Sequence, residues 1–267
     1  MPQLVTLTIE AGVADVRLNR PEKLNALNVA MVKSIVTTGE QLAATPGVRA
    51  VVVSGHGRAF CAGLDLASFA DEADQVSELL ARDHGPANLA QQAVLLWRAL
   101  PVPVIAAVHG AAFGGGFQIC LGADVRIVAP DARFSVMEVK WGLVPDMGGF
   151  VLMREVLSDS VARELTFTAR EFNGEEAVAL GVATRLSDNP YAAALALAND
   201  IATRSPDAIR AAKRLFRLAA TADDSTVLRH ETGEQRRLLG SPNQLEAVCA
   251  SRNRRPANFA DGPACQS

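Results

Sequence analysis

The sequence predicts an α/β protein in which a parallel or mixed sheet is followed by a mainly helical region. Strand and helix patterns alternate along the first half of the chain, which is typical of strands joined by crossover helices. From Phe150 onward, apolar residues recur almost entirely at helical spacing. At 267 residues and 49% hydrophobic content, the chain is long and apolar enough for a sizeable core.

Each element of the first half is predicted from its hydrophobic period and from the turn residues beside it. The opening segment alternates apolar and polar residues on both sides of an Ala-Gly pair, which predicts a hairpin. The next helix ends before Pro46 and Gly47, and short β-branched runs predict buried strands. In order, we expect a hairpin over 5–19, a helix over 28–45, a strand over 49–55, a polar stretch over 68–85, a helix over 87–100, a strand over 102–110, a helix after the glycines at 114–116 and a strand over 124–130.

The second half contains helical patterns separated by short polar breaks. An added helical layer of this kind often serves assembly, so we expect it to contribute to contacts between subunits. The expected helices cover 153–169, 174–181, 192–205, 206–220 and 225–241.

Composition excludes several classes of protein. A net charge of -3 and a pI near 5.9 give no overall attraction to nucleic acid or to an anionic membrane. The uncharged run Ala99–Ala123 is long enough to span a membrane, but its prolines and glycines make it a poor helix. The cysteines lack zinc-site spacing, so no metal is expected, and the absence of a secretory-signal pattern favours the cytoplasm.

Two segments have an unusual composition of small residues and glycines. Residues 59–69 (AFCAGLDLASF) and 111–120 (AAFGGGFQIC) each follow a buried strand and are expected to open a helix. Free backbone N–H groups at two such helix ends could together bind an oxyanion. Tight packing of a strand against a helix also selects glycine, so both interpretations stay open. Neither segment fits the dinucleotide or the P-loop pattern.

Two carboxylates and a set of basic residues are further candidates. Glu138 and Asp146 lie among apolar residues and glycines, where burial raises a carboxyl pKa toward the range that suits proton transfer. Either could instead be a salt-bridged or helix-capping residue. The basic residues form either a solvated helix face or a landing site for phosphates. They are Arg210, Lys213, Arg214, Arg217, Arg252, Arg254 and Arg255.

Four segments, taken together, resemble the crotonase superfamily of enoyl-CoA hydratases and isomerases. They are RPEKLNALN at 20–28, AFCAGLDL at 59–66, the segment 103–134 and GLVPDMGG at 142–149. The resemblance runs from the opening hairpin to the closing RRPANF. It implies a ββα superhelix over residues 1–200, followed by a helical trimerisation region over 201–267. Self-association as a homotrimer or a dimer of trimers is implied as well.

The resemblance also implies a substrate and a binding site. The backbone N–H groups of Leu64 and Gly115 would bind the oxygen of an acyl-CoA thioester, with Gly114 and Gly116 allowing close approach. Coenzyme A is then part of the substrate, and no separate cofactor is implied. The segments that would hold it contain Lys23, Leu24, Ala26, Ala62 and Leu66.

One departure from the hydratases decides the expected reaction. Gln118 stands where hydratases have one of two catalytic glutamates, and Glu138 stands at the other. Glutamine cannot take a proton, although its amide can donate a hydrogen bond to Glu138. Asp146 falls where dienoyl-CoA isomerases have an acid that shuttles protons with the acid at 138. Dienoyl-CoA isomerases have a third acid at position 118, so this sequence has two of their three acids, and certain 3-enoyl-CoA isomerases have a lone acid at 146. These residues favour double-bond isomerisation, of the 3-enoyl- or dienoyl-CoA type, over 2-enoyl-CoA hydration.

Two other functions are weighed against isomerisation. Dehalogenation in this superfamily needs a histidine on the helix before Pro101, where Gln91 and Gln92 stand instead. A non-catalytic CoA- or RNA-binding protein is the alternative of another class. The acidic pI disfavours binding to RNA. Because both glycine segments are retained, a non-catalytic protein is disfavoured as well.

Overall fold

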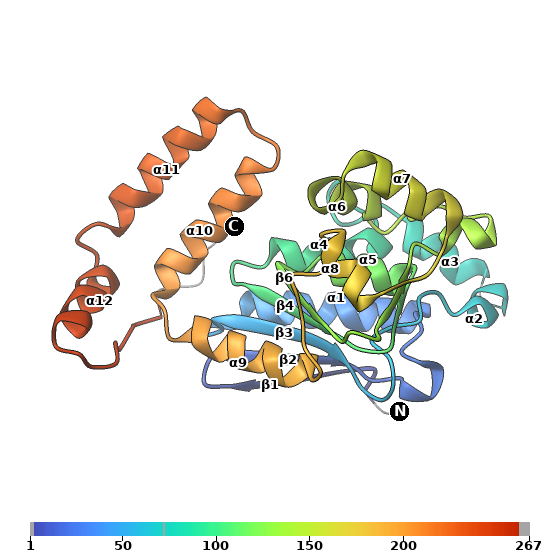
Figure 1. Cartoon of the computed structure of the whole chain (residues 1–267), viewed down its shortest axis with the longest axis horizontal. Helices are drawn as coiled ribbons and strands as arrows, with labels where there is room; N and C mark the ends of the chain where they lie inside the picture. The colour runs from blue at the N-terminus through green and yellow to red at the C-terminus, as the bar shows by residue number, and fades with distance from the viewer. Residues whose placement is uncertain (1–2, 72, 262–267) are drawn as a thin grey trace.

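The computed structural model describes residues 3–71 and 73–261 and has two sheets covered by helices (Figure 1). The larger sheet has six strands in the order β1-β2-β3-β4-β6-β9, and only the β1–β2 pair among its described strands is antiparallel. This arrangement confirms the predicted α/β class and the mixed sheet. The strands are β1 Val5–Glu10, β2 Val13–Leu18, β3 Ala50–Gly55, β4 Val104–Val108, β6 Val125–Val128 and β9 Arg185–Leu186.

The opening hairpin forms where the sequence predicts it. Ala11 and Gly12, the turn residues, have φ of 48° and 81°, the left-handed values that a two-residue hairpin turn requires. Because the turn fixes the register, Val5 pairs with Leu18. The chain then crosses through α1 (Val29–Ala44), whose N-cap Asn28 accepts a hydrogen bond from the Met31 N–H, and returns as β3 parallel to β2.

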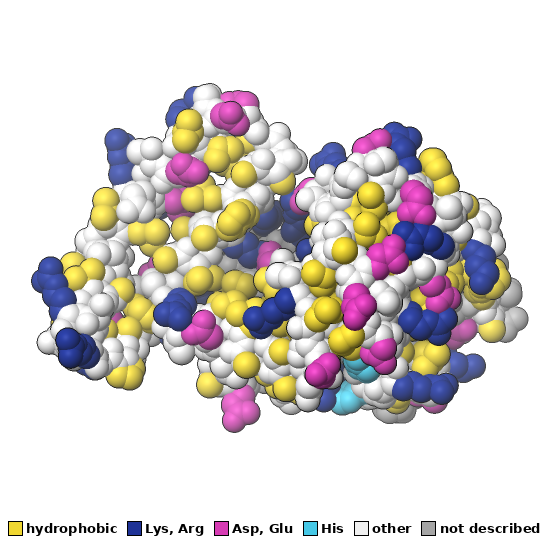
Figure 2. Space-filling view, viewed as in Figure 1, with side chains coloured by type: hydrophobic (Ala, Val, Ile, Leu, Met, Phe, Trp, Pro, Cys, Tyr) yellow, Lys and Arg dark blue, Asp and Glu magenta, His cyan; other side chains and the backbone are white. Residues whose placement is uncertain are grey.

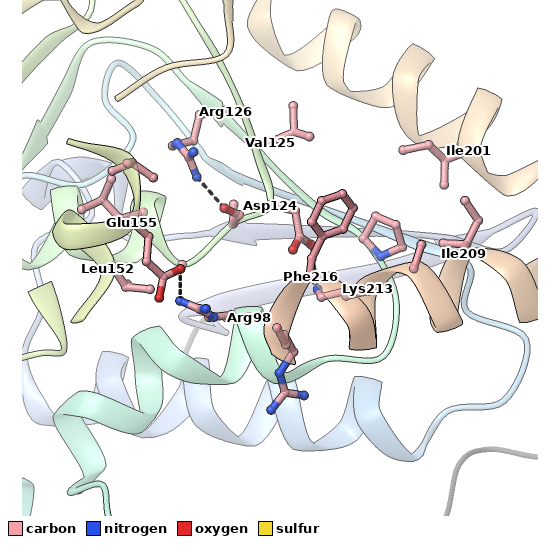
Figure 3. A pocket seen from close by; sticks show the side chains of 17 residues that line it. Arg98, Asp124, Val125, Arg126, Leu152, Glu155, Ile201, Ile209, Lys213 and Phe216 are labelled. Atoms are coloured by element: carbon pink, nitrogen blue, oxygen red, sulfur yellow. Dashed lines mark hydrogen bonds and ion pairs between the residues drawn. The ribbon is translucent and has the colours of Figure 1, made fainter. Parts of the chain in front are cut away.

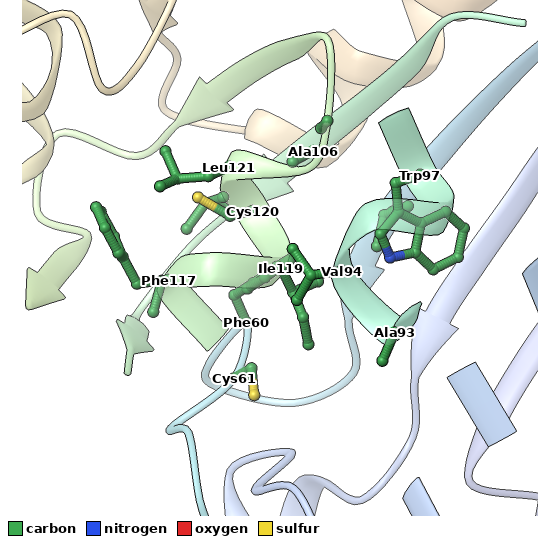
Figure 4. Close-up of a cluster of buried hydrophobic side chains, with 14 of the residues drawn as sticks. Phe60, Cys61, Ala93, Val94, Trp97, Ala106, Phe117, Ile119, Cys120 and Leu121 are labelled. Atoms are coloured by element: carbon green, nitrogen blue, oxygen red, sulfur yellow. The ribbon is translucent and has the colours of Figure 1, made fainter. Parts of the chain in front are cut away.

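The two faces of the sheet are buried against different helices. Val51 and Val53 of β3 belong to the larger core, which includes residues of α1, of α4 (Leu89–Ala99) and of α5 (Gly115–Leu121). Val52, on the other face, packs in a second core with α9 (Pro190–Ala202). Burial on both faces explains why β4 is entirely apolar and why β3 is apolar up to Ser54. Figure 4 shows side chains of α5 and α4 in the larger core.

A second, three-stranded sheet contains the start of the glycine-containing segment at 111–120. Its strands are β5 (Ala111–Phe113), β7 (Arg133–Ser135) and β8 (Phe172–Asn173). No strand was expected at 111–113, between the strand ending at 110 and the helix after the glycines, but pairing with β7 makes these residues a strand. An isolated bridge from Cys61 to Ala112 places the segment at 59–63 beside β5.

Several helices differ from the sequence-based expectation. The polar stretch over 68–85 contains most of α2 (Leu66–Asp71) and all of α3 (Ala73–Leu80), and α12 (Pro242–Arg252) was not recognised. The helix expected over 153–169 is divided into α6 (Gly149–Val156) and α7 (Asp159–Thr168). Leu157 and Ser158, both extended, divide them, and α8 (Gly174–Ala179) follows β8 as expected.

The last helices stand apart from the rest of the molecule. α10 (Pro206–Ala219) and α11 (Asp224–Leu238) form a helical pair beside the core, followed by α12 (Figure 1). Figure 2 shows apolar side chains over these helices and a hollow between them and the core. In the described part of the chain, no helix is both long and apolar enough to cross a membrane.

Candidate active site

Backbone hydrogen bonds place three segments from distant parts of the chain side by side. The Cys61 N–H donates to the Ala111 carbonyl at 2.9 Å, and the Phe113 N–H donates back to the Cys61 carbonyl at 3.0 Å. On the other side of this loop, the Leu27 N–H donates to the Gly63 carbonyl at 2.7 Å. Residues 24–27, 60–65 and 109–113 therefore form one continuous surface.

Asn25 holds this surface together and was not singled out from the sequence. It is fully buried, and its amide nitrogen lies within hydrogen-bonding distance of the His56, Ala59 and Phe60 carbonyl oxygens. Its φ of 56° is left-handed, a conformation that asparagine tolerates better than most residues. An asparagine two residues after the short helix η1 (Pro21–Lys23) was the available signal.

The two N–H groups expected to bind an oxyanion lie at adjacent points on this surface. Gly115 is the first residue of α5, so its N–H has no acceptor within the helix. A Cβ built on Gly63 would be 3.6 Å from the Gly115 nitrogen, which shows how closely the Leu64 segment approaches α5. The segment at 59–69 opens α2 at Leu66 as expected, and Leu64 lies two residues before that helix, where it bridges to Leu27.

The three consecutive glycines allow neighbouring elements to pack closely against the start of α5. A Cβ on Gly116 would lie 2.3 Å from the Cys61 carbonyl oxygen, and one on Gly115 would lie 2.7 Å from a methyl carbon of Leu27. Gly114 has a φ of 50° and lies against the Glu138 carboxyl. The packing interpretation of the glycine run is therefore confirmed, because a side chain would separate these elements. The oxyanion-binding interpretation stays a prediction.

Glu138 is the first residue of the short helix η2 (Glu138–Trp141), and its two carboxyl oxygens have different surroundings. Its Oε1 accepts a hydrogen bond of 2.6 Å from the Gln118 amide, as the sequence predicts. Its Oε2 is buried and has no hydrogen-bond partner among the described residues. Burial raises the pKa of Glu138, the Gln118 hydrogen bond lowers it, and the charge of Asp146 raises it further.

Asp146 lies close enough to Glu138 for their charges to interact. The residue is exposed as a whole, but partial burial of its carboxyl raises its pKa. In the described part of the chain, neither Asp146 nor Glu138 forms an ion pair or caps a helix through its side chain. The salt-bridged and helix-capping interpretations are therefore wrong for both carboxylates.

The residues expected to hold coenzyme A lie along the edge of the same surface. The Ala62 N–H donates to the Leu24 carbonyl at 2.9 Å, which joins their two segments. Ala26 is buried behind them, whereas Lys23 is exposed and Leu66, at the start of α2, is 40% exposed. The structure thus brings all five residues to one region.

The basic residues of α10 have structural partners. Lys213 is 6% exposed and donates to the Val102 carbonyl and to Asp124, each at 2.7 Å. Arg214 pairs with Glu234 of α11. Neither the solvated-face nor the phosphate-binding interpretation fits Lys213, because its ammonium group is already surrounded by acceptors.

A cavity of about 530 Å³ lies away from this site (Figure 3). It is bounded by Pro103 and Asp124, which precede β4 and β6, and by Phe216 of α10. The glycine segments follow the other ends of the parallel strands, so the cavity and the candidate site lie at opposite ends of these strands. In the described residues no group of His, Cys, Asp and Glu forms a metal site.

Comparisons with known proteins agree on one family. A family model described as enoyl-CoA hydratase/isomerase matches residues 8–262. The mitochondrial Delta(3,5)-Delta(2,4)-dienoyl-CoA isomerase of Rattus norvegicus is 37% identical over 210 residues, which are 75% of this chain and 64% of that protein. A Mycobacterium tuberculosis protein named "probable enoyl-CoA hydratase echA6" is 31% identical over 256 residues, which are 96% of this chain and 99% of that protein. The crystal structure of an enoyl-CoA hydratase from Bacillus anthracis matches with a TM-score of 0.87 and 26% identity, covering 96% of this chain and 99% of that chain.

Proposed function

Because this chain belongs to the enoyl-CoA hydratase/isomerase family and has its crotonase-like fold, we propose that it moves a carbon–carbon double bond along an acyl-CoA thioester. One observation supports this reaction above the others. Glu138 and Asp146 both have raised pKa values, interact through their charges and lack an ion-pair partner among the described residues. Two such carboxyls can exchange a proton with a substrate at two different carbons.

The proposed mechanism begins with polarisation of the thioester. The Leu64 and Gly115 N–H groups donate to the thioester oxygen and stabilise the dienolate that forms when a proton leaves. Removing one such donor typically costs about 3 kcal/mol of transition-state stabilisation. One carboxylate removes a proton from the acyl chain and the other carboxyl returns one at a different carbon, so the product is an isomer of the substrate.

The same family membership supports the proposed role of the neighbouring segments. Lys23, Leu24, Ala26, Ala62 and Leu66 would contact coenzyme A through backbone and apolar groups. Coenzyme A belongs to the substrate, and the mechanism uses no other cofactor. The isomerase relative supports the choice of reaction, although the chain covers 64% of that protein.

Self-association is proposed through the C-terminal helices. Large apolar side chains of α10, α11 and the following residues are strongly exposed, which favours a partner surface. A homotrimer, alone or paired as a dimer of trimers, would cover them. They are Phe216, Leu228, Leu239 and Leu245.

Mass spectrometry of products formed in deuterated, oxygen-18-labelled water tests the reaction. The substrates are a medium-chain 2-enoyl-CoA and, separately, a 3,5-dienoyl-CoA. A product with shifted unsaturation and no added oxygen is the expected result. Incorporation of labelled oxygen would instead identify a hydratase, the activity named for the Mycobacterium tuberculosis relative. Binding without turnover would favour the non-catalytic alternative.

A further inference from the structure

The peptide that carries the Leu64 N–H is held from one side by Leu27. The two residues form a parallel bridge, in which the Leu27 N–H donates to the Gly63 carbonyl at 2.7 Å and the Asp65 N–H donates to the Leu27 carbonyl at 2.9 Å. The carbonyl and the N–H of a trans peptide point in opposite directions. Because the Gly63 carbonyl points toward Leu27, the Leu64 N–H points away from it.

The start of α5 lies on the side of this loop opposite Leu27. A Cβ built on Gly63 would lie 2.6 Å from the Phe113 carbonyl oxygen and 3.6 Å from the Gly115 nitrogen. Gly63 has a φ of 85°, which glycine adopts without strain. Among the described residues, the Leu64 N–H has no backbone acceptor. The orientation of the Gly63–Leu64 peptide therefore decides whether both expected donors can reach one oxygen.

An ion pair joins the two segments of this bridge through their neighbouring residues. Arg20 Nη1 donates to Asp65 Oδ2 at 2.7 Å and to the Ala26 carbonyl at 3.1 Å. Asp65 follows Leu64 in the chain, and Ala26 precedes Leu27, so one nitrogen atom contacts both segments. Both side chains are largely buried, with 14% of Arg20 and 10% of Asp65 exposed.

Asp65 stays ionised in this environment. Burial acts to raise the pKa of Asp65, but hydrogen bonds from Arg20 and Ser68 hold it below its usual value. Glu22 is a weaker partner of Arg20, since its carboxylate is 3.9 Å away and mostly exposed. Removing one member of a buried ion pair leaves the other charge unpaired, so the Arg20–Asp65 pair strongly restrains both side chains.

We propose that Arg20 and Asp65 are a positioning pair that keeps the Leu64 N–H directed at the thioester oxygen. This inference deepens the proposed function, because it rests on Leu64 as a donor. The pair fixes the segment at 63–65 against residues 26 and 27. Without it, the Gly63–Leu64 peptide is free to turn, and the enolate loses part of the stabilisation that this donor supplies.

Acetoacetyl-CoA tests the donors without any migration of a double bond. This 3-ketoacyl thioester ionises to an enolate whose ultraviolet absorbance can be titrated, and donors to its thioester oxygen lower the pKa of the bound ligand. We expect Asp65→Asn and Arg20→Gln each to raise that pKa by about one unit, a tenfold loss of enolate stabilisation. The double variant should lose no more than either single variant, because the two side chains act together.

Affinity for free coenzyme A separates positioning from general support of the fold. Coenzyme A has no thioester carbonyl, so its Kd should change by less than about threefold in these variants. Arg20→Lys keeps a charged donor for Asp65 and should lie closer to the wild type than Arg20→Gln does. If affinity for coenzyme A falls as much as enolate stabilisation, the pair only supports the binding surface, and the proposal is overturned.

Asp159→Asn is the matched control. It breaks the ion pair between Arg163 and Asp159, which has the same 2.7 Å separation but lies at exposed positions of α7. The control should leave both the pKa of bound acetoacetyl-CoA and the affinity for coenzyme A at their wild-type values.

This inference and the proposed function fail in different ways. Suppose that the wild type isomerises neither substrate but lowers the pKa of acetoacetyl-CoA, and that Asp65→Asn weakens this effect. The proposed reaction is then wrong and the inference stands. If the wild type leaves that pKa at its solution value, or if Asp65→Asn matches the wild type, the inference is overturned at any isomerisation rate.

Discussion

At the scale of single residues, the site depends on carboxyl groups that are not fully satisfied. Glu138 buries one oxygen without a partner in the described structure, and an unsatisfied buried group typically costs about 1–3 kcal/mol. Asp146 lies near enough to raise the Glu138 pKa further. Groups that lower stability in this way are common where a side chain must exchange protons.

Asp146→Asn should abolish isomerisation while leaving substrate binding nearly unchanged. The variant removes one proton-exchanging group but leaves the Leu64 and Gly115 donors in place, so kcat should fall by about 100-fold or more and KM should change by less than about threefold in either direction. Steady-state kinetics with a 3,5-dienoyl-CoA measures both. Asp131→Asn, at an exposed position, is the control. Undiminished turnover by Asp146→Asn would remove this residue from the mechanism.

Glu138→Gln should be more stable than wild type at pH 7.5, by about 1 kcal/mol in the free energy of unfolding. The pKa of Glu138 is raised in the folded protein, so the folded state holds this proton more tightly than the unfolded state. Wild-type stability therefore falls as pH rises from the ordinary glutamate pKa through the raised one. Urea unfolding at pH 7.5 and pH 4.5 should show the advantage shrinking at the lower pH. An equal advantage at both would indicate a packing effect.

At the scale of the elements, the site depends on how closely α5 lies against the loop at 60–63. Gly116 lies where any side chain would meet the Cys61 carbonyl, so the first turn of α5 approaches the loop backbone directly. The same contact brings the Gly115 N–H beside the Leu64 segment. Packing of two elements thus sets the distance between the two expected donors.

Gly116→Ala should lower the free energy of unfolding by about 3 kcal/mol and reduce activity, because backbone must move to admit the new carbon. Gly233→Ala, in the exposed helix α11, is the matched control, since a Cβ added there would meet no described atom within 4 Å. That control should gain about 0.5–1 kcal/mol from helix propensity. Denaturant unfolding compares them. Similar effects in both would show that α5 can shift freely.

At the scale of the whole molecule, one buried lysine connects α10 to the core. Lys213 reaches the Trp97 and Val102 carbonyls and Asp124, while Asp124 also accepts from the Val104 N–H. Burial lowers the Lys213 pKa, and Asp124 opposes this effect. This cluster lies beside the cavity in Figure 3, so it fixes where the C-terminal helices leave the core.

Lys213→Met should destabilise the protein by about 3 kcal/mol, because it leaves two carbonyls and a carboxylate short of a donor. Lys33→Met is the control. Lys33 pairs with Glu78 at the surface, where an ion pair typically contributes less than about 1 kcal/mol. Thermal unfolding of the two variants under one set of conditions makes the comparison. Equal shifts would show that the Lys213 cluster has no special role in stability.

Phe216→Asp should weaken self-association. Phe216 is 80% exposed on α10, and a charge placed in an apolar contact between subunits is costly to bury. Sedimentation velocity should show the wild type as a trimer or hexamer and the variant as smaller species. Asp224→Asn, at the exposed start of α11, serves as the control. An unchanged sedimentation coefficient would place the interface elsewhere.

The sequence alone determined the features that depend on residues close to one another along the chain. Periodicity and turn residues predicted the hairpin, the central strands and most helices, because these follow from residues a few positions apart. It also identified the family and the Gln118–Glu138 hydrogen bond. It missed β5, a three-residue strand that depends on a partner distant in sequence, and the break at Leu157. It also missed α12 and the helices α2 and α3 in the polar stretch.

Only the tertiary structure decided how the candidate groups act on one another. In the tertiary structure, Gln118 Oε1 accepts hydrogen bonds from two backbone N–H groups beside Asp146. Glu138 Oε2 has no partner among the described residues, and Lys213 is buried. Burial, hydrogen bonds and pKa values depend on which segments distant in sequence contact one another. Local sequence patterns do not specify those contacts.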